Sequence, residues 1–132
     1  LVAECASPEH LADSVALTER SAIVVMSHNY ARDIEYMNAA LQSPAPYVGM
    51  LGPRRRTERM FDDLNARGEP VEDAALARLH APIGLDIGGD SPEAIALSIT
   101  AEISAVMNAR NGGMLRDRRA PIHDSAAVPS LL

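Results

Sequence analysis

Two short, continuous apolar runs constrain the fold of this chain more than any other feature. Residues 21–26 (SAIVVM) and residues 47–51 (YVGML) each lie between segments with a helical pattern. A continuous apolar run is typical of a strand buried on both faces, as in a parallel sheet. Strands that alternate with helices therefore predict an α/β layer of parallel strands joined by right-handed crossovers.

Helix signals fill the segments around these runs. Ser7 and Pro8 form a capped helix start, Gly68 is well placed to end a helix, and Asp90-Ser91-Pro92-Glu93 opens the last one. We also expect residues 1–4 (LVAE) to form a short strand. The expected helices cover residues 8 to about 17, 31–41, 52 to about 66, 71–79, and 91 to about 110.

Composition narrows the functional classes. The chain has 132 residues, enough for one domain, and 47% are hydrophobic. Its formal net charge of −6 argues against general nucleic-acid binding. Cys5 is the single cysteine, which favours a reducing compartment, and no apolar run is long enough to span a membrane. We predict a cytoplasmic protein with a domain over residues 1–113 and an extended or disordered tail over residues 114–132.

Polar clusters follow both predicted strands, where open parallel sheets bind their ligands. Ser27-His28-Asn29 follows the first strand, and Gly52-Pro53-Arg54-Arg55-Arg56 follows the second. A glycine permits close backbone approach, a helix start favours an anion, and guanidinium groups match phosphate. This cluster could therefore hold a phosphate. The alternative is a solvated first turn, since consecutive helical residues point about 100° apart and cannot all face one ligand.

Other candidates also have two interpretations. His28 could contact a ligand or move a proton, or it could be a capping or buried histidine. The loop over residues 81–89 (APIGLDIGG) could wrap a ligand with Gly84, Asp86 and Gly88, or its glycines could only form turns. The histidines are widely spaced and no CxxC pair exists, so we predict no metal site and assign no catalytic residue.

Three segments carry a family resemblance. They are SAIVVMSHNYARDIEYMNAAL (residues 21–41), APYVGMLGPRRRTERM (residues 45–60) and LARLHAPIGLDIGGDSPEAIALSITAEISAVMNAR (residues 76–110). In this order they closely resemble the C-terminal domain of XdhC/CoxI-type proteins, the xanthine dehydrogenase accessory factors. The resemblance covers residues 1–113, and the run HAPIGLDIG followed by PEAIALSI is its most specific part.

The resemblance implies a fold and a function. It implies a Rossmann-like three-layer parallel sheet in a factor that matures molybdenum hydroxylases. Such a factor binds the molybdenum cofactor (molybdopterin), which is sometimes extended by a nucleotide, and helps to sulfurate and insert it. The implied partners are a cysteine desulfurase and the apo molybdenum hydroxylase. The implied cofactor-binding residues are His28, Asn29, Gly52, Arg54, Arg55, Arg56, Gly84, Asp86 and Gly88.

The sequence departs from the family in two ways. It has no Cys-Gly motif like that of the family's N-terminal domain, and no GxGxxG strand–loop–helix. We therefore expect a domain that lacks its first strand–loop–helix units and begins at the third strand. The apolar strand over residues 21–26 would then have an open edge, which favours a homo-oligomer or pairing with an N-terminal half. Whether the chain is an enzyme stays open, and a cofactor-binding chaperone is favoured.

Two rival functions remain beside this hypothesis. One is a nucleotide-dependent oxidoreductase with a Rossmann site, which the missing GxGxxG motif disfavours. The other is a structural module that only docks proteins. Dinucleotide binding would distinguish the first, and tolerance of arginine replacement at residues 54 and 55 would distinguish the second.

Overall fold

The computed structural model describes residues 1–123 of the chain. Its internal contacts divide it into two compact units, Leu1–Ile83 and Gly84–Leu132, which are described separately below. Part of the predicted tail is described, including a 3-10 helix, η2 (Leu115–Asp117). Residues 124–132 lie outside the described part, so the predicted tail remains a prediction there.

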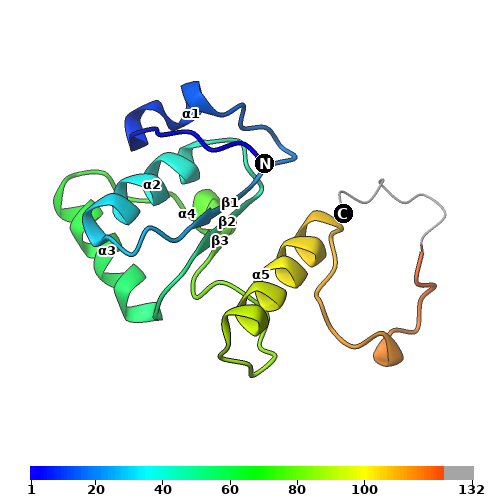
Figure 1. The fold of residues 1–132 in the computed structure, drawn as a ribbon. Helices are drawn as coiled ribbons and strands as arrows, with labels where there is room; N and C mark the ends of the chain where they lie inside the picture. The colour runs from blue at the N-terminus through cyan, green and yellow to red at the C-terminus, as the bar shows by residue number, and fades with distance from the viewer. Residues whose placement is uncertain (124–132) are drawn as a thin grey trace. The chain divides into compact units, whose positions relative to one another are not determined.

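The first unit is built on a parallel sheet. Its strands are β1 (Ala22–Val25), β2 (Tyr47–Met50) and β3 (Leu79–His80), in the order β1-β2-β3 (Figure 1). Val24 pairs with Gly49 and Val48 with Leu79, both in parallel register. All four residues of β2 are buried, as a central strand requires. The predicted α/β class is confirmed.

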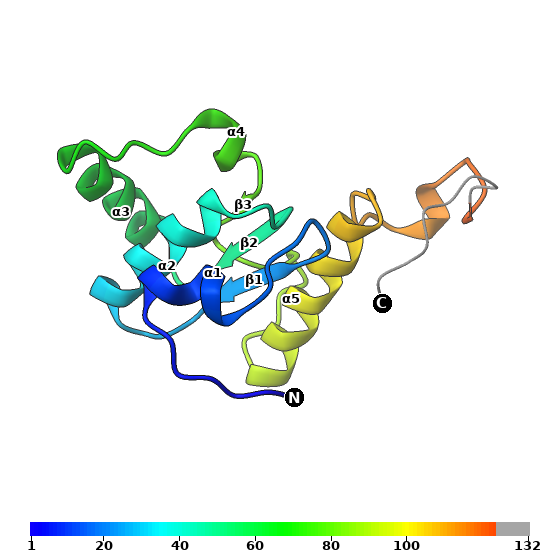
Figure 2. The same ribbon diagram turned by 90° about the horizontal axis from the view of Figure 1, so that it is seen from above.

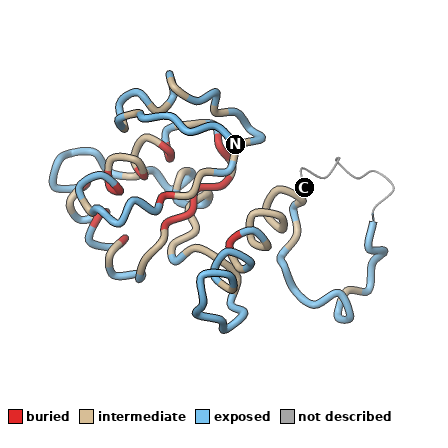
Figure 3. Tube along the Cα trace, in the orientation of Figure 1, coloured by how far each residue is buried: buried red, intermediate tan, exposed pale blue. Residues whose placement is uncertain are grey.

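Two helices of similar length cover one face of this sheet. They are α2 (Tyr30–Gln42) and α3 (Arg54–Ala66), which lie side by side in both views (Figures 1 and 2). Successive strand residues face opposite sides, so Val48 and Met50 share one face. The core of this layer joins that face to both helices, as the burial colours show (Figure 3). Its buried members are Val25, Ile34, Met37, Ala40, Leu41, Val48, Met50, Met60 and Leu64.

The opposite face of β2 requires a glycine. A Cβ atom built on Gly49 would lie 2.2 Å from Cδ1 of Ile83, far inside van der Waals contact. The Ile83 amide donates to the Met50 carbonyl (3.1 Å), which fixes the isoleucine over the strand. The glycine in YVGM therefore provides space for the segment that follows β3.

Three short helical elements complete this unit. They are η1 (Pro8–His10), α1 (Leu11–Ser14) and α4 (Asp73–Leu76). The Arg78 side chain, after α4, donates to the carbonyls of Leu41, Ser43 and Ala45. It thereby satisfies carbonyl groups at and just beyond the end of α2, which the helix itself leaves unpaired.

The second unit contains α5 (Pro92–Met107) and its preceding loop. The Ser91 side chain accepts from the Ala94 amide, so the predicted helix start is confirmed. The loop is bonded to this helix, because Ser98 Oγ donates to the Leu85 carbonyl (2.6 Å). The Gly84 amide also donates to Glu102 Oε1 (3.0 Å).

Three sequence expectations are wrong. Residues 1–4 do not form a strand, and Leu1 and Val2 are exposed. The first strand is therefore β1, which lies at one edge of the described sheet. The first helical segment ends at Ser14 rather than near residue 17. The expected helix over residues 71–79 is only one turn, and its last residue belongs to β3.

The expected strands over residues 21–26 and 47–51 are confirmed, as are the helices over 31–41, 52–66 and 91–110 to within a few residues. Gly68 adopts the left-handed conformation (φ 74°) just after α3, as its predicted role in ending that helix requires. None of the helices in residues 1–123 combines the length and the apolar character needed to cross a bilayer.

Candidate functional site at the ends of β1 and β2

The turn between β1 and α2 is closed by its own residues. Asn29 is the N-cap of α2, and its side chain accepts from the Arg32 amide (3.1 Å). The Asp33 carboxylate accepts from both the amide (3.0 Å) and the hydroxyl of Ser27. Asn29 therefore caps the helix, and its side-chain oxygen already accepts one hydrogen bond.

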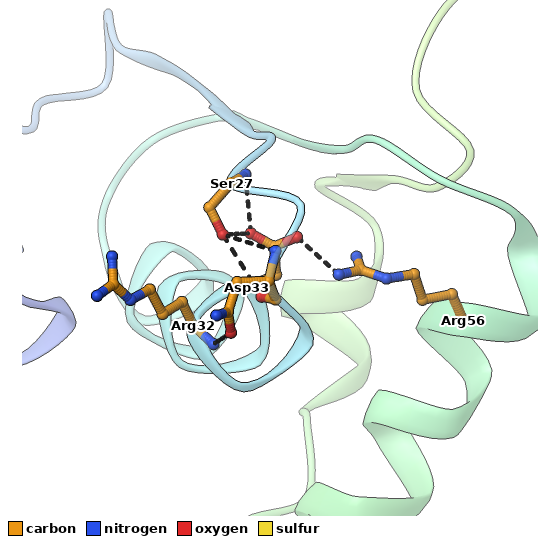
Figure 4. Close-up of polar contacts among 5 residues, drawn as sticks. Ser27, Arg32, Asp33 and Arg56 are labelled. Atoms are coloured by element: carbon orange, nitrogen blue, oxygen red, sulfur yellow. Dashed lines mark hydrogen bonds and ion pairs between the residues drawn. The ribbon is translucent and has the colours of Figure 1, made fainter.

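Asp33 links this turn to the next helix. Its Oδ2 atom pairs with Nη2 of Arg56 at 2.9 Å, and its side chain is 2% exposed (Figure 4). A buried carboxylate is costly without a charged partner, and Arg56 of α3 is that partner here. Arg56 was predicted to bind an anionic ligand. The structure pairs one of its guanidinium nitrogens with an internal carboxylate.

His28 has an unusual backbone. Its φ is +58°, in the left-handed region that residues other than glycine seldom adopt. The flanking Ser27 and Asn29 are held by the bonds above, while the exposed His28 side chain has no hydrogen bond or ion pair among the described residues. His28 therefore lies at the carboxyl end of β1 as predicted, and neither of the alternatives, capping or burial, applies.

The turn between β2 and α3 is open. Gly52 has φ +121°, a conformation that disfavours any side chain, and Pro53 is the N-cap of α3. Proline has no side-chain acceptor, so α3 begins without a side-chain cap. Arg54 and Arg55 follow, both exposed and without an ion pair among residues 1–123. The start of α3 therefore combines backbone amides that have no side-chain cap with the positive end of the helix dipole. It also carries two guanidinium groups that form no ion pair among the described residues.

Tyr30 connects the two helix starts. Its hydroxyl donates to Oδ2 of Asp63 on α3. The guanidinium of Arg59 lies 5.0 Å from the ring centroid and that of Arg56 lies 5.7 Å away, both within cation–π range. Burial, followed by the hydrogen bond to Asp63, raises the pKa of the Tyr30 phenol despite these nearby cations.

These residues line a surface hollow of about 520 Å³. Its walls are Tyr30, Pro53, Arg55, Arg56 and Arg59. Of the three consecutive arginines, the hollow includes the second and the third, and Arg54 is not in its lining. This agrees with the expectation that three consecutive helical arginines cannot face one ligand.

A second hollow, of about 490 Å³, lies between the N-terminal segment and α2. Its lining contains Glu9 and Glu35 and no arginine or lysine. This acidic lining disfavours an anionic ligand, whereas two of the predicted arginines, Arg55 and Arg56, line the hollow at α3.

The remaining predicted residues lie in the second unit. Gly84 and Gly88 have positive φ values of 106° and 80°, and a Cβ atom on Gly84 would lie 2.3 Å from Ser98 Oγ. Close packing against α5 and the positive φ both favour glycine at residue 84. Asp86 is exposed in the same loop.

Sequence reasoning missed Tyr30, Asp33 and Arg59. Arg59 had a local signal, because it stands four residues after Arg55 and therefore on the same face of α3. Asp33 and Tyr30 had none, since their partners lie 23 and 33 residues further along the chain.

Comparison with known proteins agrees with this architecture. A family model, the XdhC Rossmann domain, matches residues 2–103. The chain is 33% identical over 93 residues to the uncharacterized protein YqeB of Escherichia coli K12, covering 70% of this chain and 16% of YqeB. It is 33% identical over 98 residues to a probable xanthine dehydrogenase subunit from Bacillus subtilis 168, covering 74% of this chain and 27% of that protein.

A solved structure is also similar. The crystal structure of a xanthine dehydrogenase from Bacillus halodurans matches with a TM-score of 0.63 and 29% identity, covering 81% of this chain and 29% of that one. The chain therefore spans less than a third of the length of each of these relatives. The family model covers most of the chain, and the parallel sheet with its two helices fits a Rossmann domain, so this chain belongs to the XdhC family.

Proposed function

We propose that this chain is the Rossmann domain of an accessory factor that serves a molybdenum hydroxylase of the xanthine dehydrogenase type. Membership of the XdhC family supports this proposal, as do relatives whose names refer to xanthine dehydrogenase. In this role the domain binds the molybdenum cofactor, alone or extended by a nucleotide, and takes part in its sulfuration and insertion. The cofactor supplies the redox and oxygen-transfer chemistry once it is in the hydroxylase.

The single observation that carries cofactor binding is the arginine-lined hollow at the start of α3. The cofactor bears a phosphate, and the hollow offers guanidinium donors beside an uncapped helix start. Arg55 would hold the phosphate, Gly52 would allow close backbone approach, and His28 would touch the pterin. The donor set therefore fits the phosphate part of the group.

The partners follow from this function. A cysteine desulfurase would supply the sulfur, and the apo-hydroxylase would receive the cofactor. β1 is an edge strand of the described sheet, and parts of Ile23 and Val24 are accessible beside the buried Val25. We propose that this edge pairs with a second copy or with another segment of the longer protein.

The test is a titration of molybdopterin into this chain and into an Arg55→Gln variant. The expected result is saturable binding that weakens about tenfold or more in the variant, because a charge-assisted bond contributes about 1.5–3 kcal/mol. A Gln variant of Arg20, an exposed arginine outside the hollow, serves as the charge-matched control and should bind within about twofold of the wild type.

Absence of binding to every variant would contradict cofactor binding by this domain. A full-length factor that still supports hydroxylase activity with the Arg55→Gln change would favour the protein-docking function instead.

A further inference from the structure

We propose that Arg55 and Arg59, with Tyr30 as their platform, form a two-arginine clamp selective for a dianionic phosphate such as a terminal phosphomonoester. The proposal deepens the proposed function and rests on it only for the identity of the molecule that carries the phosphate. Neither Arg59 nor Tyr30 was part of the predicted site.

The spacing on α3 places both arginines on one side. Residues four apart in a helix lie one turn above the other, so Arg55 and Arg59 are neighbours. Both line the same hollow and both are exposed. Each guanidinium presents a planar fork of donors, and two forks can satisfy the oxygens of one phosphate.

The two guanidinium groups are held in different ways. Arg59 lies 5.0 Å from the centroid of the Tyr30 ring, and that ring is anchored through its hydroxyl to Asp63. The platform limits the freedom of the Arg59 side chain before a ligand arrives, which reduces the entropy lost on binding. Pro53 forms the wall beside Arg55 at the helix start.

Charge explains the selectivity. Arg56, the third arginine of the hollow, is already paired with the buried carboxylate of Asp33. Asp63 accepts the hydrogen bond of the Tyr30 phenol and forms no ion pair among residues 1–123. The clamp therefore keeps two positive charges that have no ion pair within residues 1–123, on a chain whose net charge is −6. Two unpaired cations match a dianion better than a monoanion.

The test compares two ligands that differ in one charge. Methyl phosphate provides a terminal phosphomonoester, and dimethyl phosphate provides a monoanionic diester that differs from it by one methyl group. Each is titrated into the full chain at low and at moderate salt and followed by calorimetry or by amide shifts of α3. We expect the phosphomonoester to bind at least tenfold tighter, with a difference that shrinks as salt rises.

Variants then test the residues. Arg55→Gln and Arg59→Gln should each weaken phosphomonoester binding about tenfold or more. Arg20→Gln removes the same charge at an exposed position outside the hollow and should change binding less than about threefold. Because all three side chains are exposed, the unfolding midpoints of these variants should stay close to that of the wild type.

Tyr30 is tested as a positioning residue. Tyr30→Phe keeps the ring and loses the bond to Asp63, whereas Tyr30→Leu removes the ring itself. The leucine variant should weaken phosphomonoester binding more than the phenylalanine variant, and the loss should depend on Arg59. In an Arg59→Gln background, both changes should have little further effect, which a purely structural role would not produce.

The outcomes separate the two proposals. Equal binding of both ligands, or unchanged binding in the Arg55 and Arg59 variants, would overturn the clamp whether or not the cofactor binds. Phosphomonoester binding that depends on both arginines, without any affinity for molybdopterin, would support the clamp and contradict the proposed function.

Discussion

The two helices on the sheet begin in opposite ways, although each follows a parallel strand. α2 starts at a turn whose polar groups are satisfied by Asn29 and Asp33. α3 starts at Gly52-Pro53 without a side-chain cap and with exposed arginines. Both helix starts follow the carboxyl end of a parallel strand, where open sheets bind their ligands. The local residues decide which start is closed and which stays open.

Asp33 and Arg56 make the two starts depend on each other. The carboxylate that closes the first turn also takes one arginine of the second. Removal of one partner should therefore affect both helices, and the following changes test the comparison in order of decreasing effect.

Asp33→Ala should have the largest effect. It leaves Arg56 unpaired and Ser27 without its acceptor, so we expect a loss of about 3 kcal/mol in the free energy of unfolding, measured by urea denaturation. Asp62→Ala, an exposed acid on α3, is the control and should change stability by about 0.5 kcal/mol or less. An equally small loss for Asp33→Ala would mean that this carboxylate does not stabilise the turn between β1 and α2.

Asn29→Ala removes the cap of α2. We expect a loss of about 1 kcal/mol in unfolding free energy, since the Arg32 amide loses its acceptor. Asn65→Ala, at an exposed position near the end of α3, removes the same side chain without a cap. If both variants lose the same stability, the Asn29 cap does not stabilise the start of α2 as its geometry indicates.

His28→Gly should act in the opposite direction. Glycine adopts the left-handed backbone without a steric penalty, so we expect the variant to be about 1 kcal/mol more stable. The same variant should bind molybdopterin more weakly under the proposed function. Ala109→Gly changes a residue with nearly the same φ (53°) in the second unit, and should gain stability without a change in binding. Unaltered binding by His28→Gly would remove His28 from the site.

The pH dependence of Tyr30 should give the smallest effect. Its pKa is raised in the folded state, so the stability it contributes is complete below the ordinary tyrosine pKa of about 10. That contribution is lost as pH rises through the folded pKa. In a phenolate absorbance titration, Tyr30→Phe should remove a late-titrating component, and Asp63→Asn should shift that component downward. An early titration of Tyr30 would contradict the bond to Asp63.

The sequence predicted those elements whose signals are local. The apolar run of β2, the cap of α5 and the spacing of Ile34, Met37 and Leu41 in α2 each lie within a few residues. β3 is two residues long and exists because it pairs with β2, so no local pattern could reveal it. The run LVAE was an apolar segment with no partner strand among the described residues.

The candidate site divides in the same way. The glycine, the proline and the arginines at the second strand end could be read directly from the sequence. Which arginine is available could not, because that depends on Asp33 in another helix. The aromatic platform of Tyr30 is likewise formed only when α2 and α3 pack together.

The hydrogen bonds of the Arg78 side chain affect the order in which the molecule folds during its synthesis. It bonds carbonyls that precede it by 33, 35 and 37 residues. During synthesis from the N-terminus, the end of α2 must therefore wait, with its carbonyls exposed to water, until the ribosome has released Arg78. α2 is translated before β2, α3 and β3, yet its last turn is among the final parts of the sheet layer to be completed.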